Sequence, residues 1–346
     1  MKKLLSLLFI CGMFFTYAQT DTTHEIKIKK DIQWSSPEGY DLTMDIYTPD
    51  SGMSSYPVLI IYHGGGWLIN NKSIMDQMSS YVASHGNYVV CNVDYRLLTA
   101  NDNTTNMNSI VEDALGAVIW VKEHISSYQG DPNRIAVTGD SAGGHLAAMV
   151  VNGNELLGSH GFDGNHFEFT PSYIPSGATP EELRTEGAAI VQAAILSYPA
   201  VDIYAANKGN GKPYTGFESA SNFFWQMGGG KPRGIFGNDV NAIDNPGYYK
   251  QVSPMYTIPD SNQRKLPPQF LHVGSKDNTT TPESIKAYHE ALLKAGHPSE
   301  FWIYEDRPHA YLDSGSNEYL GVSFEKDAIT PLNRILDFLN DVFYKD

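Results

Sequence analysis

Short, almost wholly apolar runs constrain the fold of this chain more than any other feature. Three of them lie at residues 57–62, 88–93 and 134–137. A strand with one solvated face would alternate apolar and polar residues, so these runs are typical of strands buried on both faces of a parallel sheet. A stretch with helical periodicity at 110–125 separates the last two runs.

Strand and helix patterns alternate to the end of the chain. Further strands are expected at 193–196, 269–273 and 300–303, with helices at 282–295 and 329–343. Near the start, 25–30 and 42–47 alternate apolar and charged residues, which predicts half-buried antiparallel strands. The order as a whole predicts a doubly wound, mostly parallel α/β sheet with antiparallel N-terminal strands.

Two stretches interrupt this alternation, at about 152–185 and 202–265. Both are rich in Gly, Pro, Asn and aromatic residues, among them Phe223, Phe224 and Trp225. Two interpretations stay open. The stretches pack as loops against the core, or they form a cap or binding wall over a site at the strand ends.

The first residues have the pattern of a secretory signal peptide. Lys2 and Lys3 precede an apolar run at 4–15, and Thr16 and Ala18 place small residues at the two positions that a signal peptidase reads. The run is shorter than the ~20 apolar residues that cross a membrane, so no membrane span is expected. The sequence therefore predicts a signal peptide at 1–18, one catalytic domain at 19–346, and export to the periplasm or beyond.

Cleavage would remove Cys11 and leave Cys91 as the single cysteine, so no internal disulfide is expected. Acidic residues outnumber basic ones, 39 to 24, and the net charge is −15. Such a chain lacks the basic surface that neutralises phosphates, which argues against nucleic acid as a partner. The oligomeric state stays open.

The segment 139–144 reads Gly-Asp-Ser-Ala-Gly-Gly and lies between the predicted strand 134–137 and an apolar helical run at 146–151. A serine on a tight strand-to-helix turn needs very small neighbours, and Gly139 and Gly143 provide them. The turn then presents the hydroxyl to a substrate. Ser141 is therefore the candidate nucleophile.

A second motif, His-Gly-Gly-Gly-Trp at 63–67, directly follows the apolar strand that ends at residue 62. Its glycines let backbone N–H groups approach the oxygen on which charge grows during acyl transfer. Gly65 and Gly66, together with the N–H of Ala142, are the predicted oxyanion hole. His63 is expected to shape this loop rather than to act as the base.

A serine nucleophile needs a base and an acid that orients it. Asp277 and His309 each follow a late predicted strand, and they come after Ser141 in the order acid, then histidine. Competing candidates are Asp306, Asp313, His272, His289 and His297. We expect Asp306 and Asp313 to be solvated loop residues.

With these motifs the chain resembles the α/β-hydrolase superfamily. It is most similar to secreted bacterial esterases of the feruloyl and acetyl-xylan type, which share both glycine motifs with hormone-sensitive-lipase relatives. The resemblance runs from about residue 41 to the end, apart from the two inserts. Around the acid, 274–282 looks more like peptidases and feruloyl-esterase-type hydrolases.

The predicted function is that of a serine esterase for acetyl or feruloyl groups on a small molecule or an oligosaccharide. Ser141 would attack the ester carbonyl, His309 would move the proton and Asp277 would orient the imidazole. No cofactor or metal is expected, because no ligand cluster has metal-binding spacing. Two alternatives stay open: an exported serine peptidase or amidase, and a non-catalytic binding protein on a hydrolase scaffold.

Overall fold

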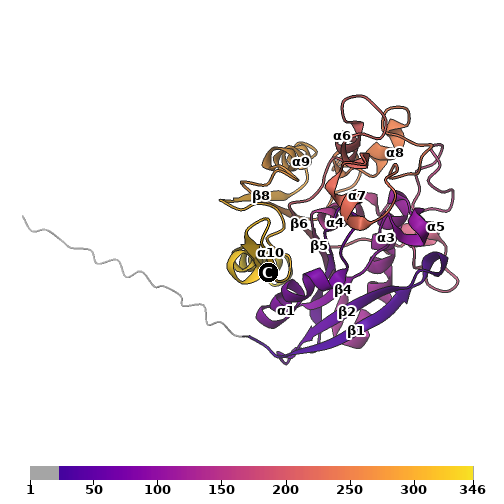
Figure 1. Ribbon diagram of the computed structural model, residues 1–346. Coiled ribbons are helices and arrows are strands. Elements are labelled where there is room, and N and C mark those ends of the chain that lie inside the picture. The colour runs from indigo at the N-terminus through magenta and orange to yellow at the C-terminus, as the bar shows by residue number, and fades with distance from the viewer. Residues whose placement is uncertain (1–22, 346) are drawn as a thin grey trace, which may run out of the picture.

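An eight-stranded mixed sheet runs through the computed structural model, which describes residues 23–345 (Figure 1). The signal peptide predicted at 1–18 lies outside the described residues. The strand order in the sheet is β1-β2-β4-β3-β5-β6-β7-β8. The strands are β1 (Ile26–Ser35), β2 (Leu42–Pro49), β3 (Tyr56–Tyr62), β4 (Val89–Val93), β5 (Gly130–Asp140), β6 (Ala193–Ser197), β7 (Gln269–Gly274) and β8 (Ser299–Tyr304).

Strand direction follows the sequence patterns. The six strands β3 to β8 pair in parallel. In contrast, β1 pairs with β2, and β2 with β4, in antiparallel fashion. The predicted fold class, a doubly wound and mostly parallel sheet with antiparallel N-terminal strands, is confirmed. The predicted half-burial is wrong for both N-terminal strands, because β2 is buried at every residue except Thr43 and β1 is mostly exposed. β1 is an exposed edge strand along most of its length, and even its apolar Ile28 is 41% exposed.

Helices cover both faces of the sheet. The α-helices are α1 (Asp76–His85), α2 (Ala100–Asn103), α3 (Met107–His124), α4 (Ala142–Gly153), α5 (Pro180–Thr185), α6 (Ile203–Lys208), α7 (Phe223–Gly228), α8 (Pro246–Gln251), α9 (Pro282–Lys294) and α10 (Ile329–Phe343). α1 and α10 pack together on one face, where Tyr81 donates a hydrogen bond to Asn333. α3, α4 and α9 lie on the other face, where Asn152 donates to Tyr288.

Shorter elements complete the fold. They are the one-turn helices η1 (Pro37–Gly39), η2 (Lys72–Met75), η3 (Ile125–Tyr128), η4 (Gly216–Glu218) and η5 (Pro254–Tyr256), the π-helical η6 (Phe324–Ala328), and the paired strands β9 (Ser316–Asn317) and β10 (Val322–Ser323). Among the described residues, no helix combines the length and the hydropathy needed to cross a membrane.

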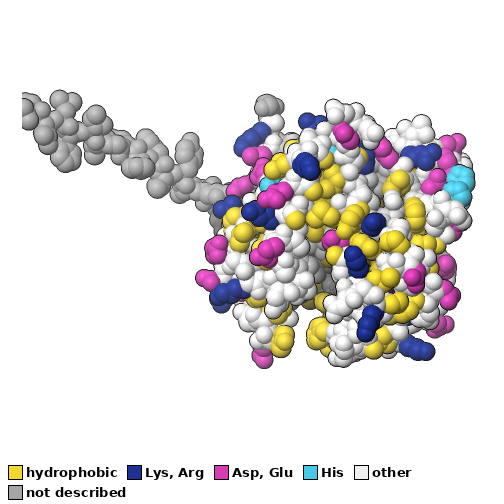
Figure 2. Space-filling view, turned by 90° about the horizontal axis from the view of Figure 1, so that it is seen from above, with side chains coloured by type: hydrophobic (Ala, Val, Ile, Leu, Met, Phe, Trp, Pro, Cys, Tyr) yellow, Lys and Arg dark blue, Asp and Glu magenta, His cyan; other side chains and the backbone are white. Residues whose placement is uncertain are grey.

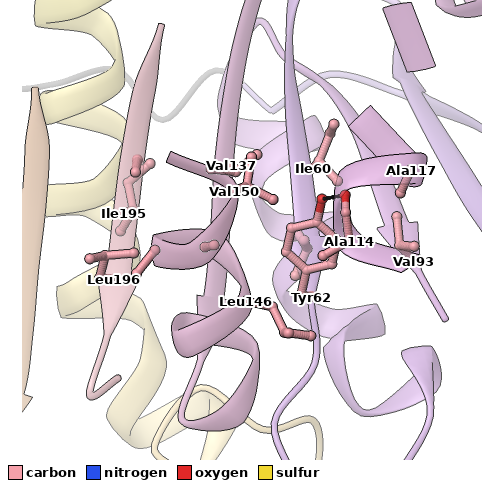
Figure 3. Close-up of a cluster of buried hydrophobic side chains, with 14 of the residues drawn as sticks. Ile60, Tyr62, Val93, Ala114, Ala117, Val137, Leu146, Val150, Ile195 and Leu196 are labelled. Atoms are coloured by element: carbon pink, nitrogen blue, oxygen red, sulfur yellow. Dashed lines mark hydrogen bonds between the residues drawn. The ribbon is translucent and has the colours of Figure 1, made fainter. Parts of the chain in front are cut away.

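The core between the central strands and their helices contains many branched aliphatic side chains. Figure 3 shows Ile60, Val137 and Ile195 from three strands in one cluster with Leu146 of α4. Full burial of each such side chain contributes about 1.5–3 kcal/mol to the free energy of folding. The Tyr62 hydroxyl in this cluster donates a 2.8 Å hydrogen bond to the carbonyl of Ala114, so no polar atom of this ring is left unpaired.

The two irregular stretches contain different secondary-structure elements. Residues 152–185 contain α5 and long loops, and their Phe162 and Phe167 pack against Phe236 and Tyr248 of the second stretch. Residues 202–265 contain α6, η4, α7, α8 and η5, and Figure 1 places α6, α7 and α8 together beyond one end of the sheet.

Candidate active site

The two glycine motifs meet where the strand order of the sheet reverses. In the sheet, β3 lies between β4 and β5. The chain runs from β3 to β4 on one side and then crosses back to β5 on the other side, so β3 and β5 are neighbours. Tyr62 and Gly139 are directly opposed in this pair. Ligand sites of open α/β sheets form at such a switch point, outside the carboxyl ends of the strands. The loop at 63–67 and the turn at Ser141 therefore lie side by side.

Ser141 occupies a strained turn between β5 and α4. Its backbone has φ 52° and ψ −112°, a left-handed conformation that is unusual for any residue except glycine. A Cβ atom at Gly143 would collide with the carbonyl of Tyr62. The turn can therefore approach β3 only because residue 143 has no side chain. Such strain at a buried polar residue is typical of a functional position.

The structure brings Ser141, His309 and Asp277 together in a hydrogen-bonded relay. His309 Nε2 lies 2.8 Å from Ser141 Oγ, and His309 Nδ1 lies 2.6 Å from Asp277 Oδ2. Asp277 Oδ1 accepts two backbone hydrogen bonds, from Thr279 at 2.9 Å and Thr280 at 3.0 Å. All three side chains of the relay are buried. The carboxylate favours a proton on Nδ1, which leaves Nε2 free to accept the serine proton.

The competing candidates lie elsewhere. Asp306 is exposed and forms an ion pair with Lys276 at 2.9 Å. His272 lies inside the sheet between Ser197 Oγ and the Tyr311 hydroxyl, and burial lowers its pKa to about 3. His289 and His297 bond to Ser299 Oγ and the Pro259 carbonyl.

The expectation that Asp313 is solvated is wrong. Its side chain is half-buried, and burial together with the charge of Asp140, the residue before the nucleophile, raises the pKa of Asp313 well above its ordinary value. The reason is that the loop after His309 turns back toward the carboxyl end of β5 instead of extending into solvent.

Contacts of His63 with Tyr95 stabilise the loop at 63–67. His63 is buried and stacks on Tyr95 with the ring centroids 4.3 Å apart, and the Tyr95 hydroxyl donates a 2.6 Å hydrogen bond to the His63 carbonyl. Burial lowers the pKa of His63, which disfavours its charged form. This side chain therefore packs inside the loop and is not part of the relay.

The predicted oxyanion residues do not all line the cavity that contains Ser141. Gly66 and Ala142 line the same cavity as Ser141, whereas Gly65 does not. Gly66 has φ 58°, and a Cβ atom there would lie 2.6 Å from the ring of Phe224. Ala142 is the first residue of α4, so its N–H has no acceptor within the helix and lies at the positive end of the helix dipole. Gly66 and Ala142 therefore lie beside Ser141, and their role as an oxyanion hole stays a prediction.

The cavity beside Ser141 has a volume of about 330 Å³ and a mostly apolar wall. Its aromatic lining consists of Trp67, Phe217 and Phe224, and the rest of the wall comes largely from residues 199–207 and 279–284. Figure 2 looks down on this end of the molecule and shows hydrophobic side chains gathered around a hollow. None of the lining residues belongs to 152–185. Of the two irregular stretches, only the second, with α6, η4 and α7, therefore contributes to the wall.

The consecutive aromatic residues of α7 have three different environments. Phe224 lines the cavity, Trp225 is fully buried against the core, and Phe223 is 58% exposed. The loop-packing interpretation therefore holds for Trp225, and the binding-wall interpretation holds for Phe224 in the same short helix.

A link between the two motifs was missed in the sequence. Trp67 Nε1 donates a 3.2 Å hydrogen bond to His145 Nδ1, and His145 Nε2 lies 2.7 Å from the carbonyl of Val252. Burial lowers the pKa of His145 to about 4, so its ring is neutral and donates through Nε2. This ring ties the oxyanion loop to α4 and to the cavity wall. The sequence signal for this link was that Trp67 directly follows the glycines of the first motif and His145 directly follows those of the second.

One group of metal-ligand type occurs within residues 23–345. The ligand atoms of His160, Glu168 and Glu181 all lie within 4.8 Å of one another. His160 is exposed and lies 2.8 Å from Glu168, as expected for a surface ion pair, and none of the three lines the cavity. The absence of a cofactor stays a prediction.

Several known proteins that are similar to this chain are named as esterases or hydrolases. The family described as BD-FAE matches residues 44–292. The carboxylesterase NlhH of Mycobacterium tuberculosis is 34% identical over 111 residues, which cover 32% of this chain and 34% of that protein. A probable isoprenylcysteine alpha-carbonyl methylesterase of Arabidopsis thaliana is 25% identical over 78% of this chain and 54% of its own length. The chain thus spans about a third to a half of these two relatives.

An AB hydrolase superfamily protein of Schizosaccharomyces pombe is 27% identical, with 82% of this chain and 71% of that protein covered. Among solved structures, native esterase 2 of Thermogutta terrifontis aligns with a TM-score of 0.61 and 24% identity, over 95% of each chain. The same esterase phosphonylated by sarin aligns with a TM-score of 0.63 and 22% identity, over 95% of this chain and 99% of its own. The fold is the α/β-hydrolase fold, as predicted.

Proposed function

Because this chain belongs to the BD-FAE family, we propose that it hydrolyses carboxylic esters through a covalent acyl-enzyme on Ser141. The observation that carries the proposal is the relay from Ser141 Oγ through His309 to Asp277, with distances of 2.8 and 2.6 Å. A buried serine on a strained turn, within reach of an oriented imidazole, is the arrangement required for nucleophilic acyl transfer.

In the acylation step, Ser141 Oγ attacks the ester carbonyl carbon while its proton passes to His309 Nε2. The carbonyl oxygen becomes negative and faces the amides of Gly66 and Ala142, which line the same cavity as Ser141. Asp277 stabilises the imidazolium that forms. The C–O bond to the alcohol then breaks, and His309 gives the proton to the leaving alcohol oxygen.

In the deacylation step, water takes the place of the alcohol. His309 removes a proton from the water as its oxygen attacks the acyl carbon, and the same two amides face the second oxyanion. The bond to Ser141 then breaks, and the proton returns to Ser141 Oγ. The carboxylic acid leaves, and the enzyme regains its starting protonation state.

For the substrate we propose a short or aromatic acyl group, acetyl or feruloyl, carried by a carbohydrate. A cavity of about 330 Å³ lies at the small end of the range for ligand pockets, which disfavours a long fatty chain. Its aromatic side chains Trp67, Phe217 and Phe224 offer flat apolar faces suited to a sugar or phenolic ring. The site of action is proposed to be outside the cytoplasm, after removal of residues 1–18.

A substrate panel tests this function. It compares acetylated xylo-oligosaccharide, methyl ferulate, p-nitrophenyl esters from acetate to palmitate, and a dipeptidyl anilide. Short or aromatic esters should be cleaved fastest, and Ser141→Ala should abolish their turnover. Preference for palmitate would contradict the acyl group proposed, and preference for the anilide would indicate a peptidase or amidase. Absence of turnover on every member would favour a binding protein.

A further inference from the structure

A single residue with a charged side chain lines the cavity beside Ser141. Among the described residues that form its wall, only Asp202 carries a carboxylate, and none carries an ammonium, guanidinium or imidazole group. Asp202 is half-buried, and the rest of the wall is mostly apolar. A charge in such surroundings is less screened than one on the open surface. The acyl-transfer steps make no use of it, so its effect falls on what the cavity binds.

One oxygen of this carboxylate has a fixed structural task. Asp202 is the N-cap of α6, and its Oδ1 accepts a 2.8 Å hydrogen bond from the backbone N–H of Ala205. Ala205 lines the cavity as well. The capping contact therefore holds the carboxylate beside the cavity wall, and it leaves the second oxygen for other contacts.

The second oxygen, Oδ2, has spare capacity to accept hydrogen bonds. Its one donor among the described residues is the Tyr256 hydroxyl at 3.4 Å, which is long for an O–H···O bond. Lys250 Nζ lies 5.6 Å from the centroid of the Tyr256 ring, and it forms no ion pair with Asp202. A carboxylate oxygen can accept about two hydrogen bonds. Oδ2 can therefore accept one from a ligand.

The other polar side chains of the wall offer less. Those of Asn207, Thr280 and Ser284 each donate a 2.8 Å hydrogen bond to a backbone carbonyl of the protein. Asn207 Oδ1 has no donor among the described residues, but this atom is shielded from solvent and so from a ligand. Asp202 is thus the acceptor that a ligand in the cavity can reach with the least rearrangement.

These contacts favour a hydroxyl group over a charged group on the ligand. A hydroxyl can donate to Oδ2, whereas a carboxylate only accepts and is repelled. In a cavity of about 330 Å³ every ligand atom lies near the wall, so an anionic group cannot move far from Asp202. A hydroxyl also loses its water at a lower cost than an ammonium group when it enters a mostly apolar cavity.

We propose that Asp202 is a specificity-determining residue of the esterase. It accepts a hydrogen bond from a hydroxyl group on the part of the ester that occupies the cavity, and it excludes esters that carry a carboxylate there. This role rests on the proposed function, and it defines the substrate class as uncharged esters with a hydroxyl group.

The test uses four methyl cinnamates at pH 7 that differ only in the para substituent: hydrogen, hydroxyl, carboxylate or ammoniomethyl. For the wild type, kcat/KM should be highest for the hydroxyl ester. It should be at least about 10-fold lower for the carboxylate ester than for the unsubstituted one, because like charges repel in a poorly hydrated site. Asp202→Asn caps a helix equally well but replaces the free acceptor by an amide donor. This variant should lose the hydroxyl preference and most of the carboxylate penalty.

Asp260→Asn is the matched control, since Asp260 is exposed, does not line the cavity, and gives the same change in net charge. It should keep the wild-type order of esters. Asp202→Ser is a second uncharged N-cap and should repeat the result of Asp202→Asn, with the melting temperature as the check on folding. The inference is overturned if Asp202→Asn and Asp202→Ser keep the wild-type order, or if Asp260→Asn loses it. Preference of the wild type for the ammoniomethyl ester overturns it too, and would make Asp202 a site for cations.

A second measurement does not depend on turnover. Isothermal titration calorimetry of Ser141→Ala with the same four esters should give the lowest Kd for the hydroxyl ester and the highest for the carboxylate ester. Adding Asp202→Asn should bring the four Kd values together. If the wild type cleaves no ester, the proposed function fails, and these Kd values still decide the role of Asp202. If esters are cleaved but the four Kd values of Ser141→Ala are equal, the inference alone is overturned.

Discussion

His309 Nε2 lies 2.8 Å from Ser141 Oγ, although 168 positions separate the two residues in the sequence. The sheet order explains this proximity, because Ser141 follows β5 and His309 follows β8, and the strands from β5 to β8 are parallel and end at the same edge of the sheet. Four predictions follow from the contacts around this pair.

Ser141→Ala should keep the fold and lose at least about 10³-fold in kcat, because members of a triad act as a unit. Adding His309→Ala should cost little more, since the nucleophile that His309 serves is already gone. Circular dichroism and the melting temperature serve as controls for folding. Additive losses in the double variant would contradict the relay.

Asp277→Asn should lower kcat by about 10³- to 10⁴-fold, because the amide no longer favours the tautomer of His309 with Nε2 free. Asp306→Asn should leave kcat unchanged, since Asp306 contacts Lys276 at the surface. Ester turnover of the two variants at pH 7 is the measurement. Equal losses would transfer the orienting role away from Asp277.

Gly66→Ala should lower kcat by about 10²-fold or more, because it disturbs an amide that lines the cavity with Ser141. Two causes can be separated. The new Cβ collides with Phe224, and the φ of 58° is itself unfavourable for alanine. Gly66→Ala with Phe224→Ala removes the collision alone, so recovery relative to Phe224→Ala assigns the loss to that contact. Full activity in Gly66→Ala would exclude this amide from the oxyanion hole.

His145 should make the protein less stable in acid. Its pKa is about 4 in the folded state and 6.5 in the reference state, so the unfolded chain binds the extra proton between these values. Its contribution to the free energy of unfolding is fully present above pH 6.5 and is lost as pH falls, by about 3 kcal/mol at pH 4.

Urea unfolding of His145→Gln between pH 4 and pH 7 measures this contribution. The variant should be less stable at pH 7, since Trp67 loses its acceptor, but its stability should fall less steeply in acid. His166→Gln, at an exposed position, should keep the wild-type slope. An unchanged slope in His145→Gln would show that His145 does not bind the extra proton on unfolding.

Some of this protein could be predicted from the sequence because the cause is local. Apolar runs specified the central strands, and a serine between glycines specified the strained turn at Ser141. Asp277 and His309 could be singled out because each follows a late strand, and the carboxyl ends of parallel strands share one edge. Helix α1 was missed, because Asp76–His85 has only a few apolar residues and packs against β2, β4 and α10, contacts that exist only in the folded chain.

Only the tertiary structure decided which side chains face one another across elements distant in sequence. The exposed state of β1 depends on its place at the edge of the sheet, which an alternating pattern does not report. The partial burial of Asp313 and the contact of Trp67 with His145 depend on how loops turn back over the strand ends. Local patterns of residues set strands and turns, because backbone conformation is a local property. Burial and the walls of the cavity depend on contacts between distant residues, and these exist only once the chain has folded.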